Sequence, residues 1–60
     1  MKVILYTTLR PGAREPYKET SIIEDDGTDD GGRLIAKFGR YEEAKSVADN
    51  MGWVVTDDNN

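Results

Sequence analysis

The segment from Tyr41 to Met51 constrains the fold of this chain more than any other part of the sequence. At about 100° per residue, its apolar side chains fall on one face and its charged and amide side chains fall outside that face. The apolar positions are Tyr41, Ala44, Val47, Ala48 and Met51. Gly52 follows where a helix commonly ends in a left-handed residue, and the β-branched and aromatic run after it is typical of a strand. The sequence therefore predicts one amphipathic helix that is followed by a short strand.

Three segments before this helix have the alternation and the β-branched or aromatic composition of strands. The predicted strands cover Lys2–Leu9, Tyr17–Ile23 and Arg33–Phe38, and a short fourth strand covers Trp53–Thr56. The order β-β-β-α-β predicts a small α+β domain, in which an antiparallel β-meander of three strands carries one packed α-helix and a short C-terminal strand. The last strand should run parallel to the first and third strands, and the pattern leaves open which of them it pairs with.

The predicted domain covers residues 1–56. Residues 57–60, Asp-Asp-Asn-Asn, have nothing to bury and are predicted to form a frayed acidic tail. With 60 residues, the chain is near the size at which burial of apolar surface only just offsets chain entropy. Only 37% of its residues are hydrophobic, and it has no cysteine or histidine that could form a disulfide or a zinc site. Oligomerisation or a bound partner is the remaining means of stabilising so small a core.

A single short helix can cover only one face of such a sheet. The residues predicted on the covered face are Val3, Leu5, Leu9, Leu34, Ala36 and Phe38. Ile4, Tyr6 and Ile35, together with Ile22 or Ile23, are then predicted on the opposite face. An uncovered apolar patch of this kind commonly marks an interface. The alternatives are that sheet twist and the long loops shield the patch, or that the assignment of the two faces is reversed.

The formal net charge is −4, and the acidic residues are concentrated in one loop that includes Asp25, Asp26, Asp29 and Asp30. Aligned from Asp26, this loop matches the first half of a calcium-binding loop, but Lys37 stands where the bidentate glutamate belongs. We therefore expect neither a metal site nor a cofactor. The loop is interpreted either as a solvated hairpin tip or as a negatively charged recognition surface, which binds a basic partner protein or imitates nucleic-acid phosphates. The predicted partner-binding residues are Asp25, Asp26, Asp29, Asp30, Ile4, Tyr6 and Ile35.

Positive charge gathers beside aromatic residues in one place, the segment that contains Arg10, Arg14 and Lys18. These residues are the candidates for an alternative function, binding of nucleic acid through phosphate contacts. Three or four such contacts give only weak, salt-sensitive affinity, and the net negative charge of the chain opposes it.

The sequence provides little for catalysis. No histidine is present to activate a serine or threonine, and Glu42 and Glu43 point about 100° apart on the predicted helix, so they cannot flank one substrate. The glycines from Gly27 to Gly32 precede a strand rather than the helix N-terminus that a phosphate-binding loop requires. We therefore expect no enzyme. The chain also has no apolar run of membrane-spanning length and no signal-peptide pattern, which predicts a cytoplasmic location.

The leading functional hypothesis is a non-enzymatic protein-binding module, with a homodimer as one form of the association. In size and acidic composition the chain resembles the accessory or inhibitor proteins that phages and mobile elements encode. That resemblance implies inhibition of a host nucleic-acid-handling or defence complex. A structural subunit of a homo-oligomer is a further alternative.

Overall fold

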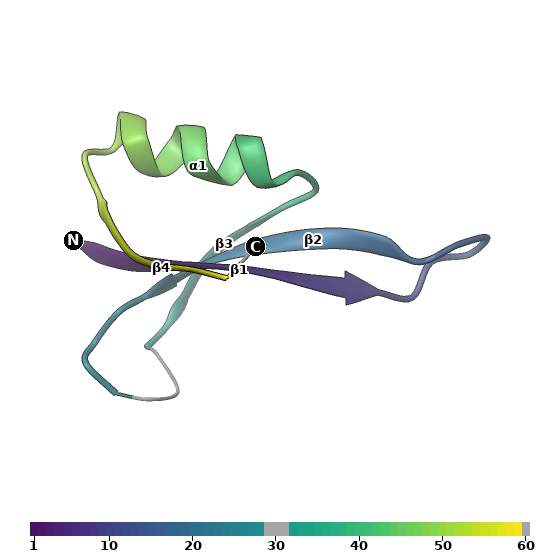
Figure 1. Cartoon of the computed structure of the whole chain (residues 1–60), viewed down its shortest axis with the longest axis horizontal. Helices are drawn as coiled ribbons and strands as arrows, with labels where there is room; N and C mark the ends of the chain where they lie inside the picture. The colour runs from purple at the N-terminus through teal and green to yellow at the C-terminus, as the bar shows by residue number, and fades with distance from the viewer. Residues whose placement is uncertain (29–31, 60) are drawn as a thin grey trace.

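The computed structural model describes residues 1–28 and 32–59, with only the backbone described for the last of these. It contains the strands β1 (Lys2–Arg10), β2 (Tyr17–Glu24), β3 (Leu34–Phe38) and β4 (Val54–Asn59) and the helix α1 (Tyr41–Asn50). The strands form one mixed sheet in the order β3-β2-β1-β4, with α1 on one side of it (Figure 1). The predicted α+β class and the β-β-β-α-β order are confirmed.

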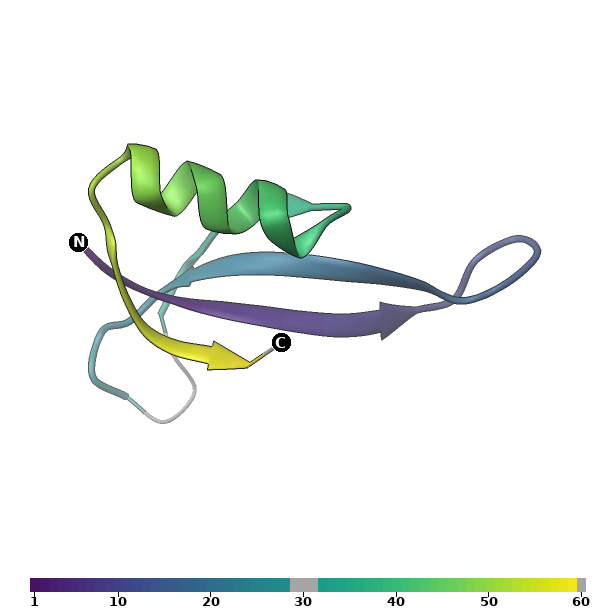
Figure 2. The ribbon, with the colours of Figure 1, turned by 45° about the horizontal axis from the view of Figure 1, so that its top comes forward.

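The pairing of the strands resolves the question that the sequence left open. β1 pairs antiparallel with β2, and β2 pairs antiparallel with β3, so the first three strands form the predicted meander. β4 pairs parallel with β1, not with β3. The connection through α1 therefore carries the chain from one edge of the sheet to the other (Figure 2).

The core lies between α1 and the sheet. Its fully buried apolar residues are Val3, Leu5, Ile22, Ala44 and Ala48. The two helical positions are alanines, and small side chains let a helix approach a sheet closely. Leu5 and Ile22 are direct cross-strand partners beneath the helix. Partly buried side chains surround this centre, and they include Phe38, Tyr41, Val47, Trp53 and Val55. The apolar stripe of α1 is thus committed to the core from Tyr41 to Ala48, whereas Met51 at its end is 60% exposed.

The C-terminus of α1 is closed by backbone hydrogen bonds. The Trp53 amide donates to the Ala48 carbonyl at 2.9 Å, and the Gly52 amide donates to the Asp49 carbonyl at 3.1 Å. This pair of bonds defines a Schellman motif, in which the residue after the helix takes a left-handed conformation. Gly52 has φ of 74°, as its predicted role requires. Trp53 then enters the core and directs the chain toward β4.

Replacing Gly52 with alanine is expected to lower the free energy of unfolding by about 1–2 kcal/mol, because a side chain at this φ is strained even where space is available. A Cβ added at Gly52 meets no atom within 4 Å, so the expected loss comes from the backbone conformation. Urea denaturation followed by circular dichroism measures it. Gly39→Ala is the matched control, because a Cβ there also meets nothing within 4 Å and the backbone is not left-handed. Equal stability of the two variants would contradict the assigned role of Gly52.

An irregularity in the pairing of β2 with β3 corrects the predicted faces of β3. Ile22 pairs with Ala36, whereas Ile23 pairs with Leu34, so Ile35 is an extra residue in a β-bulge. Leu34 consequently shares the face of Ile23, and its side chain is 47% exposed. Ile35 instead packs against the core. The prediction that placed Leu34 on the covered face and Ile35 on the opposite face is therefore wrong at both positions.

The end of the chain also differs from the prediction. β4 continues to Asn59, with Asp57 opposite Ile4 and Asp58 opposite Leu5 on β1. A second bulge, at Thr56, separates these pairs from Val55, which lies opposite Val3. The frayed tail predicted for residues 57–60 is thus wrong for 57–59, which gain backbone pairing with β1; residue 60 lies outside the described residues. The Tyr41 hydroxyl, from α1, donates to the Asp58 carboxylate and fixes the end of the strand.

Candidate functional site

The face of the sheet that points away from α1 is the first part of the candidate site. Cross-strand partners project from the same face, so the buried pair Leu5 and Ile22 places the next pair, Ile4 and Ile23, on the other side. We call this surface the open face. Its apolar residues are Ile4, Tyr6, Tyr17, Ile23, Leu34 and Val54. Ile4 and Tyr6 thus lie where they were predicted, and Ile23 rather than Ile22 joins them.

Large apolar side chains on the open face are accessible to solvent. Tyr6 is 41% exposed and Val54 is 58% exposed, and Leu34 lies between them in exposure. Ile4 and Ile23, in the middle strands, are half-buried by their neighbours. No helix among the described residues lies over this side of the sheet (Figure 2). The apolar patch therefore crosses all four strands.

The acidic residues at one end of the open face come from two segments far apart in the sequence. The Asp25 amide donates to the Lys2 carbonyl at 2.9 Å, which continues the pairing of β1 with β2. The Asp25 carboxylate then accepts a hydrogen bond of 2.5 Å from the Thr56 hydroxyl on β4. Asp57, the next residue on β4, lies beside Ile4 on the open face. The first residue of the acidic loop and the acidic end of the chain therefore border one apolar patch.

Hydrogen bonding keeps the loop carboxylates charged. The Thr56 hydroxyl, and after it the Gly27 amide, lower the pKa of Asp25 below its usual value. The pKa of Asp26 is lowered mainly by the Thr28 hydroxyl and also by the Thr28 amide. Both groups stabilise the ionised form of a carboxylate, so these two charges persist to lower pH than those of ordinary aspartates. The hydrogen bond to Asp58 has the opposite effect on Tyr41, whose pKa it raises because the phenol is the donor.

The four predicted loop aspartates are not equally placed. Asp25 belongs to the border of the open face, whereas Asp26 is exposed and bonds within its own turn, accepting at 3.0 Å from the Thr28 amide. Asp29 and Asp30 lie outside the described residues. Ile35, predicted as a contact residue, packs against the core and is not part of the open face.

The opposite end of the open face carries a small charge network. Glu19 lies 3.6 Å from Arg10 and 3.8 Å from Lys37, measured from its carboxylate oxygen to the side-chain nitrogens. Arg10 and Lys18 project from opposite faces of the β1–β2 ribbon, since their partners in the ladder are the adjacent residues Tyr17 and Leu9. Arg14 lies in the exposed turn between the strands. The structure therefore does not gather Arg10, Arg14 and Lys18 on one surface for phosphate contact.

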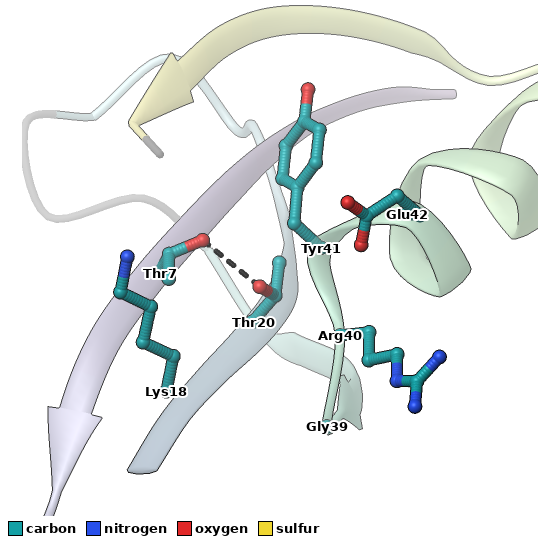
Figure 3. Close-up of a pocket in the computed structure, with 7 residues that line it drawn as sticks. All are labelled: Thr7, Lys18, Thr20, Gly39, Arg40, Tyr41 and Glu42. Atoms are coloured by element: carbon teal, nitrogen blue, oxygen red, sulfur yellow. Dashed lines mark hydrogen bonds between the residues drawn. The ribbon is translucent and has the colours of Figure 1, made fainter. Parts of the chain in front are cut away.

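A cavity of about 290 Å³ opens on the other side of the sheet, at the start of α1. Its lining residues are Thr7, Lys18, Thr20, Gly39, Arg40, Tyr41 and Glu42. The Thr7 and Thr20 hydroxyls hydrogen bond to each other at 2.9 Å, so neither is paired with a carboxylate that could act as a base. Arg40 extends away from this pair, and Tyr41 points toward the end of β4 (Figure 3). The arrangement lacks the nucleophile-and-base geometry of a catalytic site.

Two further findings concern the described residues alone. They contain no group of three or more carboxylate, imidazole or thiol side chains placed to hold a metal ion. α1, the helix that they form, is too short and too polar to cross a membrane.

Sequence reasoning missed three members of the site on the edge strands β3 and β4. Leu34 was assigned to the other face because a regular alternation has no place for the bulge at Ile35. Asp57 and Val54 were missed because the predicted final strand was short and its register was not known. The only sequence signal for Asp57 was its position directly after a β-branched run. A polar C-terminal tail has the same position, so this signal does not distinguish a strand from a tail.

Comparison with protein-family models, with curated proteins and with solved structures finds no match for this chain. The function of the chain is therefore inferred from the geometry of the open face and its charged borders.

Proposed function

We propose that this chain is a non-enzymatic protein-binding module that contacts its partner through the open face and the acidic residues beside it. The observation that carries this proposal is the exposure of Tyr6, Leu34 and Val54 on a sheet face that α1 does not cover. Contiguous apolar surface rimmed by polar residues is typical of interaction sites. Asp25 and Asp57 add negative charge at the edge of that surface, which favours a complementary partner.

We also propose the role that the size and acidic composition of the chain suggest. In this role the chain is encoded by a phage or mobile element and inhibits a nucleic-acid-handling or defence complex of the host. Complexes that bind phosphate expose basic surfaces, and a net charge of −4 on 60 residues favours association with them. The apolar part of the open face would then supply most of the affinity, and the acidic border would supply orientation and association rate.

The acidic border and the adjacent loop residue Asp26 are tested with a triple variant, Asp25→Asn, Asp26→Asn and Asp57→Asn. We expect this variant to lose at least about 90% of the partner protein that the immobilised wild-type chain retains from a lysate, because rim charges set the association rate. The matched control is Glu15→Gln, Glu43→Gln and Asp49→Asn, which removes the same charge from exposed positions away from the open face. Equal loss in both variants would indicate a non-specific charge effect, and no loss in either would contradict the proposed role of the border.

A further inference from the structure

The open face carries opposite charge at its two ends. At the acidic end are Lys2, Asp25 and Asp57, with two carboxylates against one ammonium group. At the basic end are Arg10, Glu19 and Lys37, with two cations against one carboxylate. The apolar residues Ile4, Tyr6, Ile23 and Leu34 lie between the two ends along the strands.

This charge pattern is complementary to that of a second copy rotated by 180°. A two-fold axis that reverses the strand direction places the acidic end of one copy on the basic end of the other, and the apolar centres then meet. An isologous interface requires this kind of self-complementarity. A surface of a single sign would repel its own copy.

The accessible surface of the chain also favours a second copy. This surface is 4383 Å². A compact monomer of 6.7 kDa exposes about 3,900 Å². The excess of about 500 Å² is about 60% of the ~800 Å² that each partner contributes to a standard interface, and the β1–β2 hairpin that extends beyond α1 (Figure 1) contributes part of it.

We propose that the partner of the open face is a second copy of this chain, packed face to face with its strands reversed. The product is a four-layer arrangement of helix, sheet, sheet and helix, whose central layers are about 10 Å apart. The inference rests on the proposed function, because it names the partner that the open face binds. In such a dimer the second copy takes the place of a host complex on the open face, and the loop residue Asp26 and the helix stay accessible to another protein.

The test uses two charge-reversed variants. Each of them replaces the three charged residues at one end of the open face with residues of the opposite charge. One variant is Lys2→Glu, Asp25→Lys and Asp57→Lys; the other is Arg10→Glu, Glu19→Lys and Lys37→Glu. The second variant retains opposite charges at the positions of the Glu19 network, which preserves its ion pairs in inverted form. Circular dichroism of each variant confirms that the fold is retained.

Sedimentation equilibrium over a wide concentration range gives the expected results. The wild type reaches twice 6.7 kDa. Each reversed variant alone associates at least about tenfold more weakly, because both of its ends then have the same sign. An equimolar mixture of the two variants recovers the dimer, since every end then meets an opposite charge. A monomeric mixture together with a monomeric wild type would overturn the inference.

A second pair of variants keeps the test decisive if a charge reversal fails to fold. Tyr6→Ser removes an exposed aromatic ring from the centre of the open face, and Leu9→Ser removes an exposed side chain of the same strand from the other face. Only Tyr6→Ser should weaken self-association, and equal effects would overturn the inference. If the wild type is monomeric but Tyr6→Ser still loses a protein retained from lysate, the proposed function stands and the second copy is the wrong partner. If Tyr6→Ser changes neither, both proposals fail.

Discussion

Replacing Leu5 with alanine is expected to lower the free energy of unfolding by about 2–5 kcal/mol, the cost of removing a buried leucine and leaving a cavity. Leu5 is fully buried and lies opposite Ile22 at the centre of the core, beneath the alanines of α1. A domain of 60 residues has roughly 3–9 kcal/mol in total. The expected loss is therefore about half of the total stability at mid-range, and urea denaturation followed by circular dichroism should show it as a much lower midpoint.

Leu9→Ala is the control for this experiment, because it is the same substitution in the same strand and on the same side of the ribbon. Leu9 is 66% exposed, since the β1–β2 hairpin extends beyond α1 (Figure 1). We expect a change within about 0.5 kcal/mol, as for most surface substitutions. A loss at Leu9 equal to that at Leu5 would mean that the helix covers the whole length of β1, which would contradict the described core.

The contrast between these two leucines shows which features of the fold could be predicted from the sequence alone. The alternation in β1 correctly predicts that Leu5 and Leu9 share one side of the strand. It cannot predict where the helix stops covering that side, because coverage depends on the register of α1 over the sheet. The helix itself was predictable, since its apolar positions, the glycine after it and the aromatic residue that follows all indicate the same end point.

β-Bulges contribute to the errors at Leu34 and Asp57, whereas Val54 was missed because the register of the final strand was not known. A β-bulge inserts a single residue, and a shift of one residue moves every following side chain to the other face. The bulge at Ile35 brings Leu34 to the open face, and the bulge at Thr56 sets the positions of Asp57 and Asp58. Neither position carries the glycine that often marks a bulge in a sequence. The apolar centre of the site was therefore predictable at Ile4 and Tyr6 and its border at Asp25, whereas Leu34 and Asp57 were not.

Removing residues 57–60 tests the described end of β4 directly. We expect the truncated chain to lose about 1–3 kcal/mol of unfolding free energy, at ~0.5–1.5 kcal/mol for each ladder hydrogen bond that is lost without replacement. The truncation also removes the Asp58 carboxylate that accepts the Tyr41 hydrogen bond between β4 and α1. Denaturant titration of the truncated and full-length chains measures the difference.

The double variant Asp57→Asn and Asp58→Asn separates the backbone contribution of this segment from its charge. It keeps the main-chain pairing of β4 with β1, and an asparagine oxygen can still accept the Tyr41 hydrogen bond, so its stability should change by less than about 0.5 kcal/mol. If the truncation were equally harmless, the last residues would be frayed, as their composition alone predicts. Asp57 would then have no fixed position beside Ile4, and the acidic end of the open face would retain Asp25 without its neighbour on β4. The stability of the truncated chain therefore also tests the charge complementarity on which the face-to-face dimer depends.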